Sequence, residues 1–323
     1  VNQMQSMFSG CSKLETVTIN NNFDISKVTD MSNMFNGCIK LTKINGMFKT
    51  SRNYYDTNYN KAKNMNYMFK NCYLLTSINF CASLDNSFFI SNMERTFENC
   101  NSLKSLDISR FYNYNNNINS MQCLFKSCTS LETLEIYNFE TSVVTNMQQM
   151  FYDCQKLKYI NAAFNTINVQ NMNSMFYNCK SLTSLNLNNF NTSKVNDMTN
   201  IFTNCESLKE LDLSKFHTSL ITNMQNMFSN CTSLTGIYLT ETFTTSRVNN
   251  MNSMFYNCEN LTWINLEYFD TSQVNNMNSM FYNCKKLKTW SYNINTYNVR
   301  NMGQMFYGCE SLENLYFYEN FNT

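Results

Sequence analysis

The sequence predicts an α/β solenoid, in which a short structural unit recurs along the chain and each copy forms one coil. Two observations predict this fold. Cysteines recur every 25 to 28 residues, apart from one longer step between Cys38 and Cys72. Each follows a Met by seven residues and a Phe by three, and precedes a Leu by three. A fixed period of this size is typical of solenoids. The repeat cysteines are Cys11, Cys38, Cys72, Cys100, Cys128, Cys154, Cys179, Cys205, Cys231, Cys258, Cys284 and Cys309.

The first half of each unit has the pattern of a short helix. In the copy Asn250–Cys258, apolar residues lie seven, four and three positions before the cysteine, which matches one face of an α-helix. Asn250 suits a helix N-cap, as do the Asn, Asp or Ser residues of most other copies. The residue before the cysteine, here Asn257, tolerates the left-handed conformation that ends a helix. We therefore expect about two helical turns, then a corner.

The second half has the pattern of a strand and a return turn. Ser184–Asn188 alternates between polar and apolar residues, which predicts a short strand with one buried face. The segment Thr192–Val195 suits a turn, because its hydroxyl groups can bond to the nearby backbone. Stacking would place parallel strands on one face and short helices on the other, in about 12 coils of roughly 26 residues.

The repeat pattern extends over the whole chain, so we expect residues 1–323 to form a single elongated domain. A polar, tyrosine-rich insertion interrupts the pattern around residues 45–63. Insertions into solenoids form surface loops. The sequence starts and ends inside a copy without the polar cap that solenoids need, so we expect a fragment of a longer chain.

Charge and hydropathy argue against two kinds of partner. The 24 Lys and Arg residues nearly balance the 23 Asp and Glu residues, and a net charge of +1 does not indicate binding to nucleic acid. No segment is apolar over the length that a membrane-spanning helix needs. We therefore expect no nucleic-acid partner and no membrane insertion of this segment.

No group of residues indicates catalysis, a metal or a cofactor. His217 is the only histidine, and its place in a turn leaves Ser-His-Asp and Cys-His mechanisms without a base. Zinc sites favour close cysteine pairs, whereas these cysteines are at least 25 residues apart. A column of buried thiols is the favoured interpretation, and disulfides between coils are the alternative. We expect no enzymatic activity, no catalytic residue, no metal and no cofactor.

The consensus Met-x-x-Met-Phe-x-x-Cys-x-x-Leu-x-x-Leu-x-Leu-x-x-Phe-x-Thr-Ser-x-Val resembles the repeats of BspA-like leucine-rich-repeat surface proteins. The resemblance covers nearly all of the chain, with departures at residues 45–63 and 81–90. It implies a right-handed leucine-rich-repeat-like solenoid. It also implies a non-enzymatic adhesion or protein-binding module of a cell-surface or secreted protein.

Large aromatic residues mark a candidate binding surface on the strands. Five and seven residues after each cysteine the strand points away from the core, and most copies carry small polar residues there. Towards the C-terminus these positions hold Tyr238, Trp263 with Asn265, and Tyr316. Exposed aromatic rings are typical interface anchors. Neighbouring strands lie about 5 Å apart, so Tyr238 and Trp263 should form one patch. Its ligand would be a protein, with a glycan or a second copy of this chain as alternatives.

A second aromatic column lies two residues before the cysteines, on the outer face of the expected helices. These tyrosines could bind a partner, or their rings could pack on one another from coil to coil; the second interpretation is favoured. The residues are Tyr152, Tyr177, Tyr256, Tyr282 and Tyr307.

A second class of function stays open: the solenoid could be a structural strut or scaffold component of a larger assembly. Reduced, unpaired cysteines would permit a cytoplasmic location, because disulfides persist mainly in oxidising compartments. An export signal in a longer chain would instead favour the cell surface.

The repeat phase predicts which side chains carry stability. Phe255→Ala should lower the free energy of unfolding by about 3–5 kcal/mol and Met251→Ala by about 2–5 kcal/mol, because both remove packed side chains. Asn252→Ala, expected on the surface, should cost less than about 0.5 kcal/mol. Thermal melting of the three variants measures the difference, and equal melting temperatures would contradict the assigned phase.

Overall fold

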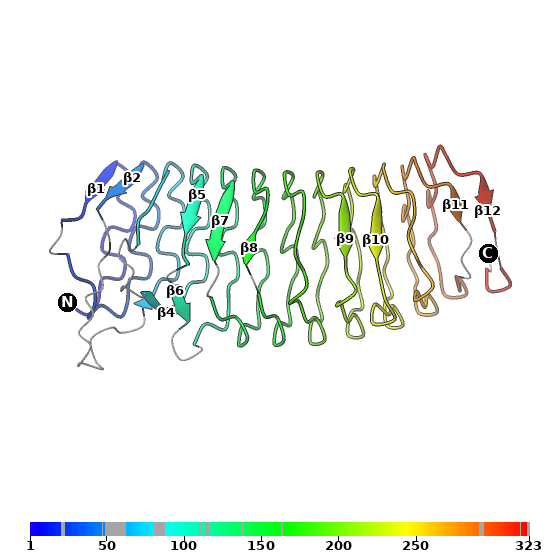
Figure 1. The fold of residues 1–323 in the computed structure, drawn as a ribbon, viewed down its shortest axis with the longest axis horizontal. Helices are drawn as coiled ribbons and strands as arrows, with labels where there is room; N and C mark the ends of the chain where they lie inside the picture. Colours follow the sequence, from blue (N-terminus) through cyan, green and yellow to red (C-terminus); the bar gives the residue numbers. More distant parts are fainter. Residues whose placement is uncertain are drawn as a thin grey trace. The chain divides into compact units, whose positions relative to one another are not determined.

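The structure is a computed structural model that describes residues 1–20, 23–46, 48, 63–80, 88–109, 111–113, 117–136, 139–162, 164–290, 294–316 and 318–321. They form two compact units, Val1–Asn165 and Thr166–Thr323. Each unit is a stack of coils that follow one another along the chain (Figure 1). Most of the predicted insertion lies outside the described residues. The single domain expected over residues 1–323 stays a prediction.

Short parallel strands follow the cysteine in several copies, as the alternation predicts, but Ser184–Asn188 is not a strand. In β9, Leu211 is buried between the exposed Glu210 and Asp212, and all strand pairs in the described residues are parallel. A further sheet, β3-β4-β6, lies in the first unit. The first unit contains β1 (Thr16–Thr18), β2 (Lys43–Asn45), β3 (Lys63–Asn64), β4 (Phe88–Asn92), β5 (Ser105–Asp107), β6 (Phe111–Asn113), β7 (Thr133–Ile136) and β8 (Asn161–Ala162). The second contains β9 (Glu210–Asp212), β10 (Gly236–Tyr238), β11 (Thr289–Trp290) and β12 (Asn314–Leu315).

The expected short helices are wrong: no helix occurs in the described part of the chain, and the Met-to-Cys segments are successions of turns. In copies such as Met251–Cys258, alternate N–H groups of the segment donate to carbonyl groups of the next coil. The N–H groups between them close tight turns within the coil, as from Met254 to the carbonyl of Met251 at 3.2 Å. In this copy the bonds between coils run from Met251 to Asn276 (2.9 Å), Ser253 to Asn278 (2.9 Å), Phe255 to Met280 (2.9 Å) and Asn257 to Tyr282 (2.7 Å).

Two left-handed residues in every copy are the reason that no helix forms. Ser253 has a φ of 54° and Asn257 has a φ of 56°, and the residues five and one before each repeat cysteine all have positive φ. An α-helix of L-residues cannot contain such a residue in its interior. The left-handed Asn or Gly before the cysteine was correctly predicted, although it closes a turn and not a helix.

The predicted N-cap residues also have another role. The Oδ1 atom of Asn250 accepts a hydrogen bond from the N–H of Asn252 at 3.0 Å. Asp30 and Asn276 make the same bond to the residue two positions on. This bond stabilises a turn at the start of the segment. Asn and Asp at this position therefore fit either the N-cap of a helix or the start of a turn.

The apolar residues form columns that stack from coil to coil. Phe255 and Met251 are fully buried, and the ring of Phe255 stacks on Phe228 and Phe281 with centroid distances of 5.3 and 5.1 Å. The inward positions of the pattern are therefore confirmed. Asn252 was expected on the surface. It is half-buried, and its side chain accepts a hydrogen bond from Asn278 of the next coil at 3.2 Å. Its substitution would remove a contact between coils, so the exposed Glu241 is the better control.

Polar side chains inside the stack also bond from coil to coil. The hydroxyl of the buried Thr245 donates to the carbonyl of Asp270 at 2.8 Å, and the buried Thr271 bonds to Asn295 at 2.9 Å. A second ladder joins the amides before the cysteines. Its bonds connect Asn230 to Asn204 (2.8 Å), Asn257 to Asn230 (2.8 Å) and Asn283 to Asn257 (3.0 Å).

Substitution of Ser253 by Gly and by Ala distinguishes turns from a helix, because the two structures predict a different order of stability for the two variants. In a helix, Ala is better than Gly by about 1 kcal/mol. At the observed φ of 54°, Gly avoids the left-handed penalty of about 1–2 kcal/mol that Ala incurs. We expect Ser253→Gly to be more stable than Ser253→Ala by about 1 kcal/mol in urea unfolding. A more stable Ala variant would contradict the turn structure.

Candidate binding surface on the sheet of the second unit

The structure brings together two of the four predicted binding residues. Tyr238 and Trp263 are 49% and 43% exposed, and their ring centroids lie 5.3 Å apart with the planes at 71°. Tyr316 is also exposed, but it follows β12 and its N–H bonds to Trp290. The half-buried Asn265 accepts a hydrogen bond from the N–H of Glu267 at 2.9 Å. Tyr238 and Trp263 thus form an aromatic pair, and Asn265 mainly shapes a turn.

Gly236 provides the space in which the indole ring of Trp263 lies. A Cβ atom at Gly236 would approach the indole atoms to 2.6–2.7 Å, which is closer than packed atoms tolerate. Gly236 is buried although it occupies an outward-facing strand position. The pattern analysis missed this residue. The sequence does contain an indication of its role: five residues after the cysteine, every other copy has a residue with a side chain, and only this copy has a glycine.

A shallow recess of about 630 Å³ lies beside this aromatic pair. The register of β9 and β10 places Glu210 opposite Gly236 and Asp212 opposite Tyr238. Tyr238 therefore forms one side of the recess, and two carboxylates lie on the neighbouring strand. The lining residues are Thr183, Ser184, Leu185, Lys209, Glu210, Asp212, Thr235 and Tyr238.

Hydrogen bonds lower the pKa of one of these carboxyl groups. Oδ1 of Asp212 accepts a bond from the N–H of Ser214 at 2.9 Å. Hydrogen bonds from the Ser214 side chain and backbone lower the pKa of Asp212, and the nearby charge of Lys215 contributes in the same direction. Glu210 is exposed on the same strand. The recess thus has two carboxylates, one of them with a lowered pKa, and the ammonium group of Lys209.

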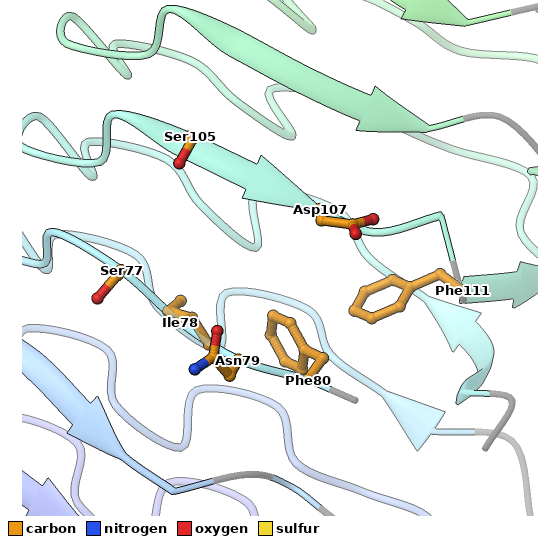
Figure 2. Close-up of a pocket in the computed structure, with 7 residues that line it drawn as sticks. All are labelled: Ser77, Ile78, Asn79, Phe80, Ser105, Asp107 and Phe111. Carbon is orange, nitrogen blue, oxygen red and sulfur yellow. The ribbon is translucent and has the colours of Figure 1, made fainter. Parts of the chain in front are cut away.

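A smaller recess of about 210 Å³ lies on the first unit (Figure 2). Figure 2 shows Ser105 and Asp107 on β5, with Phe80 and Phe111 among the residues beside them. The two phenylalanines are buried and pack edge to face with a centroid distance of 4.9 Å. Asp107 accepts the N–H of Ser109 at 2.9 Å. Because these rings are core residues, this recess lacks the exposed anchors of the larger one.

The tyrosines before the cysteines stack on one another where the structure gives their ring contacts. Tyr282 lies between Tyr256 and Tyr307, with centroid distances of 4.7 and 4.8 Å. Their planes differ by 12° and 15°. This geometry favours packing over a separate binding stripe.

The repeat cysteines form a ladder of hydrogen bonds and not disulfides. The thiol of Cys258 donates to the carbonyl of Phe228 at 3.2 Å, and that of Cys231 donates to Phe202 at 3.1 Å. All cysteines in the described residues are free. Burial raises the pKa of Cys231 to about 12, despite the opposing effect of a hydrogen bond with the backbone of Cys205. These thiols are therefore protonated at neutral pH.

The described residues contain no cluster of His, Cys, Asp and Glu that could hold a metal ion. His217 is exposed, as expected, but it lies between two turns, with Nδ1 3.2 Å from the carbonyl of Lys215. Within the same described residues, no helix has the length and apolarity to cross a bilayer.

The stacked coils and the outward aromatic pair define a leucine-rich-repeat-like β-solenoid. The chain belongs to the family described as "Mycoplasma protein of unknown function, DUF285", whose model matches residues 1–111, 91–211, 155–238 and 201–321. No curated protein matches it. This family description does not mention BspA-like proteins, so the expected BspA-like assignment stays a prediction.

Solved leucine-rich-repeat proteins are similar in fold at low identity. A leucine-rich cell surface protein from Faecalibacterium prausnitzii is 17% identical, with a TM-score of 0.44, over 98% of this chain and 83% of that one. A leucine-rich-repeat protein from Bacteroides ovatus is 20% identical, with a TM-score of 0.39, over 97% and 81%. One from Eubacterium ventriosum is 15% identical, with a TM-score of 0.37, over 92% and 83%. No inference about function rests on these scores.

Burial predicts the order in which the thiols react. Cys11 is exposed and Cys309 is half-buried, so these two should be alkylated first in the native protein, and the buried cysteines only after unfolding. Cys123 and Cys81 lie outside the repeat column of cysteines. The side chain of Cys123 is buried and should also label late, and Cys81 lies outside the described residues. Mass spectrometry after timed iodoacetamide treatment, without reductant, measures the order. A mass lower by two hydrogens per cysteine pair would contradict the free thiols.

Proposed function

We propose that this protein is a non-enzymatic protein-binding repeat module whose second unit binds its partner through the sheet surface at Tyr238 and Trp263. One observation carries the proposal. Tyr238 of β10 and Trp263 of the next coil lie in ring contact, yet each keeps more than two-fifths of its surface exposed. Mutual packing therefore covers only part of the rings.

Folding alone does not account for this pair. The outward positions of β9 carry Glu210 and Asp212, which are polar and exposed. The next copies along the chain replace such residues with Tyr238 and Trp263. Exposed aromatic surface costs solvation free energy and is recovered when a partner covers it, which is why Tyr and Trp are common binding anchors.

Adhesion by a cell-surface or secreted protein is the biological setting that the BspA-like repeat pattern suggests. In that setting the partner would be a protein outside the cell. A glycan and a second copy of this chain are the alternative ligands, and the experiment below distinguishes them from a peptide ligand.

The thiol ladder supports a second candidate, a structural strut in a reducing compartment. Each thiol donates its hydrogen to the neighbouring coil, as Cys258 does to Phe228, and oxidation would remove that donor. A cytoplasmic scaffold would preserve these bonds. Thiols that are reduced in protein isolated directly from its cells would support this candidate, and oxidised thiols would count against it.

The binding proposal predicts that the aromatic pair is needed for peptide recognition. A random-peptide phage library should yield peptides that bind the wild-type protein. Their affinity for the Tyr238→Ser, Trp263→Ser double variant should fall by roughly tenfold or more, because anchor residues dominate interface energies. Titration by fluorescence anisotropy measures the change.

The matched control replaces two aromatic rings on the turn face. Tyr256→Ser with Tyr282→Ser removes a stacked pair of similar size and should leave peptide affinity unchanged. Both double variants must first melt cooperatively. Equal binding to the Tyr238 and Trp263 variant would remove this face as the site. Failure of the wild type to select any peptide would argue against a peptide ligand, and sedimentation and glycan arrays then test the alternatives.

A further inference from the structure

The recess beside Tyr238 combines an aromatic wall with negative charge. Glu210 and Asp212 lie opposite Gly236 and Tyr238 in the parallel register of β9 and β10. Neighbouring strands are about 4.8 Å apart, and both carboxylate residues are exposed on the face that carries Tyr238. The tyrosine ring and both carboxylates line the same recess.

We infer that this recess binds the cationic side chain of an arginine or lysine in an extended segment of a partner protein. This inference rests on the proposed function, because it assigns the chemistry of the ligand to the same surface. The aromatic pair anchors the partner, and the carboxylates select a positive charge.

The charges of the recess support a cation over an anion. Within the described part of the chain, the ion pairs involve neither Glu210 nor Asp212. Ser214 donates hydrogen bonds to Asp212, which lowers the pKa of this carboxyl group. An anionic or apolar group placed here would take these carboxylates out of water without compensation. Among the lining residues, Lys209 provides one positive charge against two carboxylates, and Lys215 adds a second positive charge near Asp212 from outside the lining.

The tyrosine ring adds a second attraction for the same charge. A cation near the face of an aromatic ring is attracted by the negative potential of the ring. A guanidinium group can lie on the face of a ring and at the same time donate paired hydrogen bonds to a carboxylate. We therefore expect arginine to bind more tightly than lysine, because its planar group suits both contacts.

Trp263 and Gly236 position this wall. The indole of Trp263 contacts the ring of Tyr238 at a centroid distance of 5.3 Å, and it lies where a Cβ atom of Gly236 would otherwise be. Gly236 has no positive φ, so its backbone accepts Ala. Gly236→Ala should thus displace the indole and loosen Tyr238 without a change of charge. Gly236 is a positioning residue. Gly236→Ala should therefore weaken binding of the cationic peptide less than Glu210→Gln or Asp212→Asn does.

The test uses labelled short oligo-arginine, oligo-lysine and oligo-glutamate peptides, titrated by anisotropy against the 323-residue protein. The wild type should bind oligo-arginine best and oligo-glutamate not measurably. Glu210→Gln and Asp212→Asn should each weaken oligo-arginine binding by roughly tenfold or more, because each removes a charge-assisted bond. The amide introduced by Asp212→Asn keeps an oxygen that can accept the N–H of Ser214, so the turn and the fold should persist.

Control variants distinguish binding at the recess from unspecific attraction between the peptide and the charged surface of the protein. Glu267→Gln changes the net charge by the same amount at an exposed residue of the same unit and should leave the affinity unchanged. Tyr238→Phe keeps the ring and should bind nearly as well, whereas Tyr238→Leu should not. Gly236→Ala should also shift the tryptophan fluorescence, to which the exposed Trp263 and the buried Trp290 both contribute.

Three results would overturn the inference. Equal losses in the Glu210→Gln and Glu267→Gln variants would indicate unspecific attraction of a polycation. Oligo-glutamate binding would reverse the sign of the charge preference. Binding to phosphatidylcholine vesicles, lost in Tyr238→Leu, with no binding of basic peptides would assign the cation to a lipid headgroup. If library peptides without basic residues still need Tyr238 and Trp263, the proposed function stands and only the cation preference fails.

Discussion

The hydrogen bond from an N–H group of one coil to a carbonyl group of the next is the interaction on which this structure depends. Turn segments such as Met251–Cys258 use every second N–H group for such bonds and close tight turns with the others. Buried backbone groups must be paired, and this alternation pairs them without a helix or a long strand. It requires two left-handed residues in each copy, as at Ser253 and Asn257. A coil by itself has no partner for half of these donors, so each coil gains its stability from its neighbours.

The same constraint explains the polar residues of the interior. A thiol is small enough for the apolar column, and it donates to a carbonyl of the preceding coil, as Cys258 does to Phe228. The buried hydroxyl of Thr245 bonds to the following coil in the same way. Valine has nearly the shape of threonine but lacks this donor. The repeated Cys and Thr positions are therefore explained by coil-to-coil bonding, and the raised thiol pKa of Cys231 follows from its burial.

Against this regular background the sheet surface of the second unit is a local exception. The copies around β10 replace small outward residues with Tyr238 and Trp263, and Gly236 leaves room for the indole ring. The carboxylates of Glu210 and Asp212 lie on the adjacent strand. Coil stacking needs neither the rings nor the charges at outward positions. This independence is why a repeat scaffold can carry a local binding surface while its core stays unchanged.

The sequence by itself determined the repeat, its phase and the inward columns, because burial requires an apolar residue at the same place in every copy. Phe255 and Cys258 were placed correctly on this basis, as was the outward direction of Tyr238 and Trp263. The conformation of the Met-to-Cys segment was decided only by the tertiary structure. Its apolar spacing fits a helix face and a run of turns equally well, and the donors that favour turns bond to residues in another coil. The role of Gly236 and the recess also depended on neighbouring strands, since the spacing within one copy carries no information about the side chain that lies above it.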